Sequence, residues 1–324
     1  MDKSKKQKWL KLALGLIVTV ALLWFVFSKV NWVEFLTALS SVNLLSVALA
    51  LGFMLGARFL YGMKWWVLAP GERLLPMIRA YFKAQPFFML PMGGFTGDAA
   101  RISLMRRGAK DAYKVASATV IDRLTMPLPT LVVTLPLFTL MGARLPWGGW
   151  AVAFLILIAV VCAGSVALLL SQRGRGLLLR ALSFLKRWKW GNKAYVQLEK
   201  TASSLEGKNV AAWRVVACVG LGFLGDVAFS MVYASLGPQM GAVLDFSEWI
   251  WLFAVASIAT TLVYTAGGLG VREGAVVGIL AAKGVATGTG MTLSLLYTGL
   301  NALSILVCWC LGSLFGRDRP GNKR

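Results

Sequence analysis

Long apolar runs recur along this chain and restrict its fold more than any other feature. Several are about as long as the roughly 20 residues that a helix needs to cross the hydrocarbon core of a bilayer. Charged residues make up only 15% of the 324, and hydrophobic residues make up 58%. Backbone N–H and C=O groups in lipid must form hydrogen bonds within the protein, so a single apolar segment that crosses the bilayer is a helix. The sequence therefore predicts an all-α polytopic membrane protein in which residues 1–324 form a single membrane domain.

Two shorter apolar segments each contain a Gly-Gly pair that is followed, four residues later, by a charge. Both segments are broken by turn-forming residues and are poorly suited to a complete crossing. Broken helices at corresponding positions of two halves indicate the binding site of a transporter. We therefore expect both segments to enter the membrane and return as re-entrant hairpins. The pairs and their charges are Gly93-Gly94 with Asp98, and Gly267-Gly268 with Arg272.

Lys and Arg gather between the apolar runs and give the chain a net charge of +21. Such a bias marks the cytoplasmic loops of a membrane protein and favours contact with an anionic inner leaflet. We therefore expect both termini and the basic loops to be cytoplasmic, and we expect no nucleic-acid partner. Of the 34 basic residues, 27 lie in four stretches: 1–11, 64–116, 171–208 and 317–324.

The sequence predicts a short external turn at residues 28–41, an interfacial amphipathic helix at 177–188, and long helices at 10–27, 42–62, 115–141, 147–170, 212–236 and 288–315. Counting crossings from the cytoplasmic start gives about six to eight transmembrane helices with two re-entrant hairpins. A first repeat over residues 42–141 begins outside, and its broken segment starts and ends on the cytoplasmic side. A second repeat over 212–315 runs in the same order from the cytoplasm, and its broken segment starts and ends outside. This is an inverted repeat, and its halves are joined by a basic cytoplasmic loop at 171–208. Residues 249–282 are long enough for either a re-entrant hairpin or two tilted spans, and the sequence leaves both open.

Charged residues inside the apolar segments are candidates for substrate binding, because a charge at the bilayer centre costs at least about 2.5–3.5 kcal/mol. The planar guanidinium of Arg suits a phosphate, and the carboxylates could balance the arginines when no ligand is bound. The alternative is internal salt bridging that only holds helices together. Arg58 and Arg214 are interpreted as snorkelling residues at helix ends. The candidates are Gly93, Gly94, Asp98, Arg101, Asp122, Arg123, Asp226, Gly267, Gly268, Arg272 and Glu273.

The chain contains no His, which removes the commonest general base and a common metal ligand. The sequence predicts no catalytic residue, no metal and no cofactor, and its four cysteines are interpreted as small core residues. A G-x-G-x-x-G match at residues 220–225 lies inside a predicted helix without a preceding strand, so it is interpreted as packing glycine instead of a nucleotide site.

Three segments resemble the lysylphosphatidylglycerol synthase transmembrane family: residues 93–101, Asp122-Arg123 and residues 267–274. This family is similar to the membrane flippase half of the multiple peptide resistance factor. The resemblance covers about residues 10–315 and implies lipid translocation in a bacterial inner membrane. We expect no soluble synthase domain, and hence no lipid synthesis by this chain.

The expected function is that of a lipid translocase. It would move an anionic phospholipid, an aminoacyl-phospholipid or a polyprenyl-linked lipid between leaflets, with membrane lipids as its partners and no enzymatic activity. One alternative is a non-transporting membrane subunit that works with an enzyme of a lipid or glycan pathway. A less favoured alternative is an intramembrane enzyme acting on lipid phosphates, a class that relies on His. The sequence leaves open the lipid, the direction and energy source of transport, and the oligomeric state.

Overall fold

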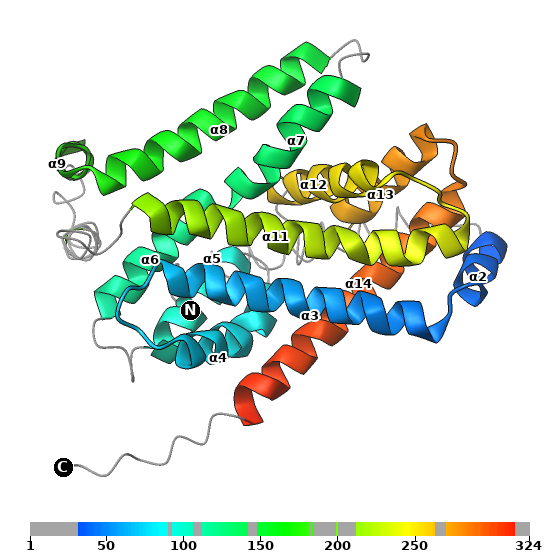
Figure 1. The fold of residues 1–324 in the computed structure, drawn as a ribbon, viewed down its shortest axis with the longest axis horizontal. Helices are drawn as coiled ribbons and strands as arrows, with labels where there is room; N and C mark the ends of the chain where they lie inside the picture. Colours follow the sequence, from blue (N-terminus) through cyan, green and yellow to red (C-terminus); the bar gives the residue numbers. More distant parts are fainter. Residues whose placement is uncertain are drawn as a thin grey trace, which may run out of the picture. The chain divides into compact units, whose positions relative to one another are not determined.

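The structure is a computed structural model that describes residues 32–89, 93–105, 112–141, 148–181, 212–262 and 270–314, with the single residues 183 and 199. Every regular element within these ranges is helical (Figure 1). The predicted helix at residues 10–27 and the Gly267–Gly268 pair lie outside the described residues, as does most of the loop from 182 to 211. In the part of the chain that is described, the all-α prediction is confirmed.

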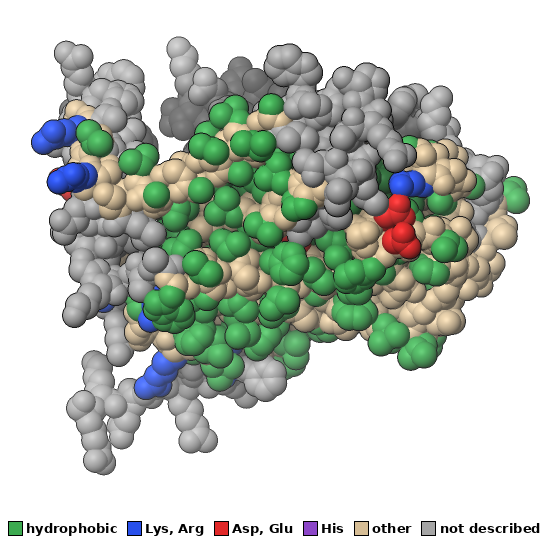
Figure 2. Space-filling view, turned by 45° about the horizontal axis from the view of Figure 1, so that its top comes forward, with side chains coloured by type: hydrophobic (Ala, Val, Ile, Leu, Met, Phe, Trp, Pro, Cys, Tyr) green, Lys and Arg blue, Asp and Glu red, His purple; other side chains and the backbone are tan. Residues whose placement is uncertain are grey.

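Four of the described helical segments have the length and the apolar composition needed to cross a membrane. They are Leu44–Val67, Tyr113–Pro136, Trp213–Met240 and Thr287–Leu314. Two shorter apolar stretches, Leu155–Leu168 and Phe246–Thr261, accompany them. Hydrophobic side chains also spread over the described surface that is visible in Figure 2, and charged side chains are few there. The chain is therefore a multi-pass helical membrane protein.

The chain divides into two compact units, each assembled from separate stretches of sequence. Unit 1 comprises residues 1–58, 82–100 and 225–324, and its core joins side chains from residues 50–54, 232–256 and 276–300 around Tyr233 and Tyr297. Its elements are α2 (Trp32–Ser40), the first part of α3 (Leu44–Val67), η1 (Gln85–Met89), most of α5 (Gly93–Met105), the second part of α11 (Ala212–Leu236), η3 (Gly237–Met240), α12 (Phe246–Leu262), α13 (Val271–Ala282) and α14 (Thr287–Leu314).

Unit 2 comprises residues 59–81 and 101–224, and its core includes Trp65, Met77, Ile121 and Cys218. It contains the end of α3, most of α4 (Leu74–Ala84), the end of α5, α6 (Ala112–Thr125), α7 (Pro127–Met141), α8 (Gly148–Leu170), α9 (Gln172–Ala181) and the first part of α11. The first residues of the predicted interfacial helix, 177–188, belong to α9, and the rest lie outside the described residues.

Several helix boundaries differ from their sequence-based positions for physical reasons. The predicted helix at 42–62 extends to Val67, because apolar residues continue past Lys64. The single helix predicted at 115–141 is divided at Met126 into α6 and α7. Pro127 explains this division, since proline disfavours helical geometry in the residue before it but suits a helix start. Residues 32–40, expected in an external turn, form α2.

Two pairs of short helices lie around the predicted broken segments, although α4 falls almost entirely in the basic stretch that precedes the first of them. α4 and α5 have 11 and 13 residues, and α12 and α13 have 17 and 12. At about 1.5 Å of rise per residue, each is shorter than the roughly 30 Å hydrocarbon core. Residues 249–282 are thus largely two short helices. Each pair follows a long helix, α3 or α11, and precedes another long apolar stretch, α6–α7 or α14.

Candidate functional site

Three charges in unit 2 join α3, α5 and α6, and we call them the cation cluster: the buried Lys64 and Arg101 and the partly buried Asp122. The Lys64 Nζ lies 3.2 Å from Asp122 Oδ1, and the Arg101 Nη2 donates a hydrogen bond to Asp122 Oδ2 at 2.8 Å. Lys64 and Arg101 are each only 1% exposed. One carboxylate therefore serves two buried cations within a spanning segment.

Trp65 positions the cation cluster. Its indole Nε1 donates a hydrogen bond to Thr119 Oγ1 at 3.0 Å, which fixes the ring between α3 and α6. The guanidinium of Arg101 lies 4.8 Å from the centre of this ring, in a cation–π contact. Trp65 is fully buried, so the aromatic face shields Arg101 from lipid while the carboxylate neutralises its charge.

Two small contacts bring α11 close to the cation cluster. A Cβ added at Gly222 would lie 2.6 Å from Pro129 Cγ and 3.5 Å from Lys64 Cδ, so glycine is required for this approach. One turn earlier, Cys218 Sγ lies 3.3 Å from Thr125 Oγ1. Gly222 is therefore packing glycine as predicted, but nothing lies within 4 Å of a Cβ added at Gly220, which lines open space.

Arg123 follows Asp122 but differs from it in environment. It is partly exposed, and its Nη1 contacts the sulfur of Met126 at 3.4 Å. Successive residues of a helix are about 100° apart, so the two side chains leave α6 in different directions. The structure brings Asp122 and Arg101 together, and the charge of Arg123 also acts on Asp122.

In unit 1, Arg272 lies against a stack of two tyrosines. Its guanidinium is 5.0 Å from the centre of the Tyr297 ring, and this ring stacks on Tyr233 with a centroid separation of 4.5 Å and an interplanar angle of 3°. Arg272 is partly buried in the first turn of α13. It is therefore held by an aromatic surface near a helix N-terminus, where backbone N–H groups favour anions.

Glu273 stabilises the start of α13 and is almost completely buried, with 1% exposure. Its carboxylate accepts hydrogen bonds from the Gly270 backbone N–H at 2.6 Å and from Thr298 Oγ1 at 2.7 Å. Gly270 has a φ of 82°, a conformation that favours glycine. Among the candidate residues, Glu273 thus has a structural role as a helix cap that also ties α13 to α14.

Arg58, which was interpreted as a snorkelling residue, is buried inside unit 1. It is 6% exposed and does not extend to a membrane surface as a snorkelling side chain would. Its guanidinium donates hydrogen bonds to Ser304 Oγ at 2.8 Å, to Asn301 Oδ1 at 2.6 Å and to Gln85 Oε1. Arg58 therefore links α3, η1 and α14 inside unit 1.

Asp226 and Asp98 complete the described candidates. Asp226 lies on α11 with 4% exposure, and together with Arg272 and Arg58 it acts electrostatically on Tyr297.

Asp98 is partly buried in the second turn of α5, which begins at Gly93. A Cβ added at Gly97 would lie 2.4 Å from the Phe88 ring. This close approach and a hydrogen bond from Thr96 Oγ1 to the Phe87 carbonyl at 2.7 Å fold η1 back onto α5.

Arg214 and the cysteines were assigned roles outside the candidate site. Arg214 is partly exposed near the start of α11 and donates a hydrogen bond to the Val67 carbonyl at 3.0 Å. Cys218 and Cys308 are buried core residues as predicted, Cys162 is half-buried and Cys310 is exposed. Within the described ranges, no group of three or more Cys, Asp and Glu side chains could hold a metal ion.

The fold and its buried charges define a polytopic helical membrane protein with ionisable groups inside its spanning segments, and such groups are candidates for a functional role. The chain belongs to the family described as the lysylphosphatidylglycerol synthase TM region, whose model matches residues 12–308. This membership associates the chain with a membrane-lipid-related role. Neither the curated proteins nor the solved structures give a match.

Proposed function

We propose that this protein is a lipid translocase that moves a phosphate-bearing lipid between the leaflets of a bacterial inner membrane. The candidate lipids are an anionic phospholipid, an aminoacyl-phospholipid and a polyprenyl-linked lipid. Family membership supports a lipid substrate. The single observation that carries the proposal is the cation cluster, in which the one negative charge of Asp122 faces two buried cations and leaves one positive charge for an anionic ligand.

The chemistry of the cation cluster suits a phosphate. A guanidinium binds two oxygens through its planar fork, and an ammonium adds a compact charge with three donors. In the paired state Asp122 occupies the place that a phosphate would take. A phosphate that displaced this carboxylate would meet Arg101 already oriented by Trp65. The three charges of the cluster leave one positive charge unbalanced, which the negative charge of a bound phosphodiester would balance.

The order of the helices supports an inverted repeat. We propose that α4–α5 and α12–α13 are re-entrant pairs that approach the membrane interior from opposite faces. Their lengths are too short for complete crossings. In such repeats the two halves can alternate in exposing a central site to either side. Arg272, near the N-terminus of α13, would offer a second contact for an anionic headgroup.

The proposed orientation places both termini and the basic loop at 171–208 in the cytoplasm. Basic residues outnumber acidic ones there by nine to two, since 171–208 holds nine Lys and Arg but only Glu199 and Glu206. Of the described part, α9 carries three arginines in ten residues. Such a segment attracts anionic lipids at the inner leaflet and would raise the local concentration of substrate.

The test is a leaflet-exchange assay with purified protein in liposomes. Fluorescent phosphatidylglycerol, an aminoacylated form and a polyprenyl phosphate would be scored separately for access to a membrane-impermeant reagent, with and without a pH gradient. We expect at least one lipid to exchange faster than in empty liposomes. Lys64→Met should reduce that rate, while the matched control Lys283→Met, which alters a half-exposed Lys of unit 1, should not.

Two other outcomes would overturn the proposal. If none of the lipids moves and the protein co-purifies with an enzyme of a lipid or glycan pathway, the chain is a membrane subunit of that pathway. If phosphate is released from labelled lipid, the chain is an intramembrane enzyme instead of a translocase.

A further inference from the structure

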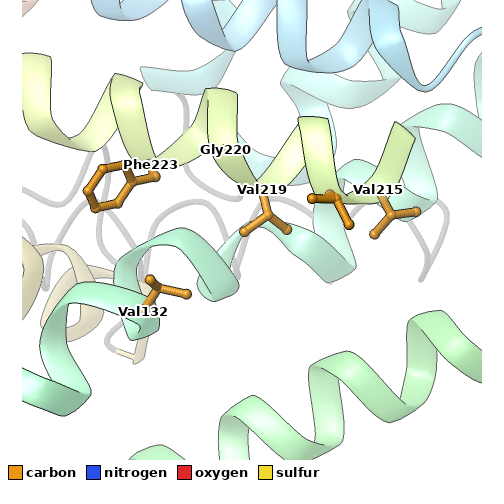
Figure 3. A pocket seen from close by; sticks show the side chains of 6 residues that line it. Val132, Val215, Val219, Gly220 and Phe223 are labelled. Atoms are coloured by element: carbon orange, nitrogen blue, oxygen red, sulfur yellow. The ribbon is translucent and has the colours of Figure 1, made fainter. Parts of the chain in front are cut away.

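An open apolar groove lies in unit 2 between α11 and α7, and we call it the valine groove. Its volume is about 430 Å³. Figure 3 shows Val215, Val219 and Phe223 extending from α11 toward Val132 of α7. The remaining lining residues are Val216 and Gly220. The lining of the groove is therefore apolar on both sides.

The shape of the valine groove depends on one missing side chain. A Cβ added at Gly220 would meet no atom within 4 Å. Gly220 and Val216 are one helical turn apart and both exposed, and Val132 across the groove is 56% exposed. Gly220 has no side chain, and no neighbouring side chain fills the space above it. This space leaves room for a long, thin apolar ligand.

The valine groove and the Lys64 side chain of the cation cluster both lie beside α11. Cys218 and Gly222 form the row that contacts Thr125, Pro129 and the aliphatic stem of Lys64. Val215, Val219 and Phe223, spaced at i and i+4, form the next row and line the groove. In unit 2 the aliphatic stem of Lys64 and the valine groove therefore lie along neighbouring rows of α11.

We propose that the valine groove binds one hydrocarbon chain of the same lipid whose phosphate is bound by the cation cluster. This inference rests on the proposed function, which places the phosphate headgroup at the cation cluster. The pairing of charge with an apolar channel matches a charged amphiphile. A soluble anion would leave the groove empty, and a neutral lipid would bring no negative charge to the cation cluster.

Selection must come from the headgroup end. A chain that leaves the bilayer for an apolar groove gains little from the hydrophobic effect, because lipid tails are already apolar. It gains close packing instead. The occupant is therefore the lipid held by its phosphate, and bulk bilayer lipid would fill the groove without regard to headgroup.

The experiment uses the full-length protein in detergent with phosphatidylglycerol that carries a diazirine on one acyl chain. After photolysis, peptides that contain residues 215–223 are quantified by mass spectrometry. We expect stronger labelling by this probe than by diacylglycerol with the same chain. Lys64→Met should remove that preference, and Gly220→Leu should reduce labelling about tenfold, because a leucine side chain would occupy the space of the ligand.

Gly164→Leu is the matched control, since Gly164 is also an exposed helical glycine of unit 2 with nothing within 4 Å of an added Cβ. It should leave the labelling unchanged. Equal labelling by phosphatidylglycerol and diacylglycerol would assign the groove to bulk lipid and overturn the inference. So would unchanged labelling in Gly220→Leu.

The labelling reports binding and not movement. Headgroup-dependent labelling without leaflet exchange would sustain this inference while the translocase proposal failed. Leaflet exchange that is equally fast in wild type and Gly220→Leu, with headgroup-independent labelling, would sustain the translocase and remove the groove from its mechanism.

Discussion

The Lys64 ammonium lies 3.2 Å from the Asp122 carboxylate, and this ion pair ties the last turn of α3 to α6. Arg101 on α5 shares the same carboxylate at 2.8 Å. Three helices therefore meet at one acidic group. Because both cations are buried, the stability of this junction depends more on Asp122 than on either cation.

This unequal dependence predicts an order of stabilities. Asp122→Asn should lower the free energy of unfolding by about 3–5 kcal/mol, since it leaves Lys64 and Arg101 without the carboxylate that they share. Lys64→Met should cost much less, because the Arg101–Asp122 pair remains intact. Thermal unfolding in detergent would measure both. Equal losses in the two variants would show that Asp122 does not hold the junction.

The helices of this chain could be predicted from sequence because apolar run length is a direct requirement of the bilayer. The predicted helix at 212–236 coincides with α11, and the one at 288–315 differs from α14 by one residue at each end. Lys64 was missed because the helix before it was expected to end at residue 62, which made Lys64 a loop charge. The apolar residues that follow it, Trp65 to Ala69, were the signal that could have extended the helix.

The partners of the charges could not be predicted, because sequence spacing favours local pairs. Asp98 and Arg101 stand three residues apart, an ordinary helical pairing distance. The tertiary structure also gives Arg101 a carboxylate from α6 and an aromatic face from α3, and neither could be predicted from the spacing. The burial of Arg58 could not be predicted either, since its hydrogen-bond acceptors on η1 and α14 are distant in sequence.

A second prediction concerns the start of α13. Glu273→Gln should lower stability by about 1–2 kcal/mol, because it weakens a buried helix cap and its bond with Thr298. Thr298→Val should cost less, as it removes one of the two hydrogen bonds but leaves the cap. Gly270→Ala should also destabilise, since its φ is 82°. Urea unfolding in detergent would test this order, and a neutral Glu273→Gln would show that the cap is dispensable.

A third prediction separates headgroup contact from folding. Arg272→Ala and Asp98→Asn should each abolish leaflet exchange while the protein still accumulates in the membrane. Arg272 is partly buried against Tyr297, so its removal leaves the tyrosine stack in place. Tyr297→Phe keeps the aromatic face and should retain exchange. Unaltered exchange in both charge variants would remove Arg272 and Asp98 from the mechanism.

A fourth prediction concerns pH. A hydrogen bond from Lys283 Nζ at 2.6 Å lowers the pKa of the Glu248 carboxyl from its ordinary value of 4.5. A lowered pKa contributes stability that is present above the unfolded value and lost as pH falls through the folded one. Lys283 is 41% exposed, so the effect should stay below about 1 kcal/mol. Wild type should therefore lose slightly more thermal stability than Lys283→Met between about pH 6 and pH 4, and parallel curves would contradict this.

The last prediction tests the topology on which the inverted repeat depends. Residues 171–208 are expected in the cytoplasm and 237–247 outside, because basic residues gather in the first range and the second has none. Single cysteines at Gln172 and Val243, in a chain with its four native cysteines replaced, should react with a membrane-impermeant maleimide from opposite sides. Val243 is 83% exposed, and it is a better site than Gly241, whose φ of 83° disfavours a side chain. Labelling of both positions from the same side would place an even number of crossings between them, and the two re-entrant pairs could then not approach from opposite faces.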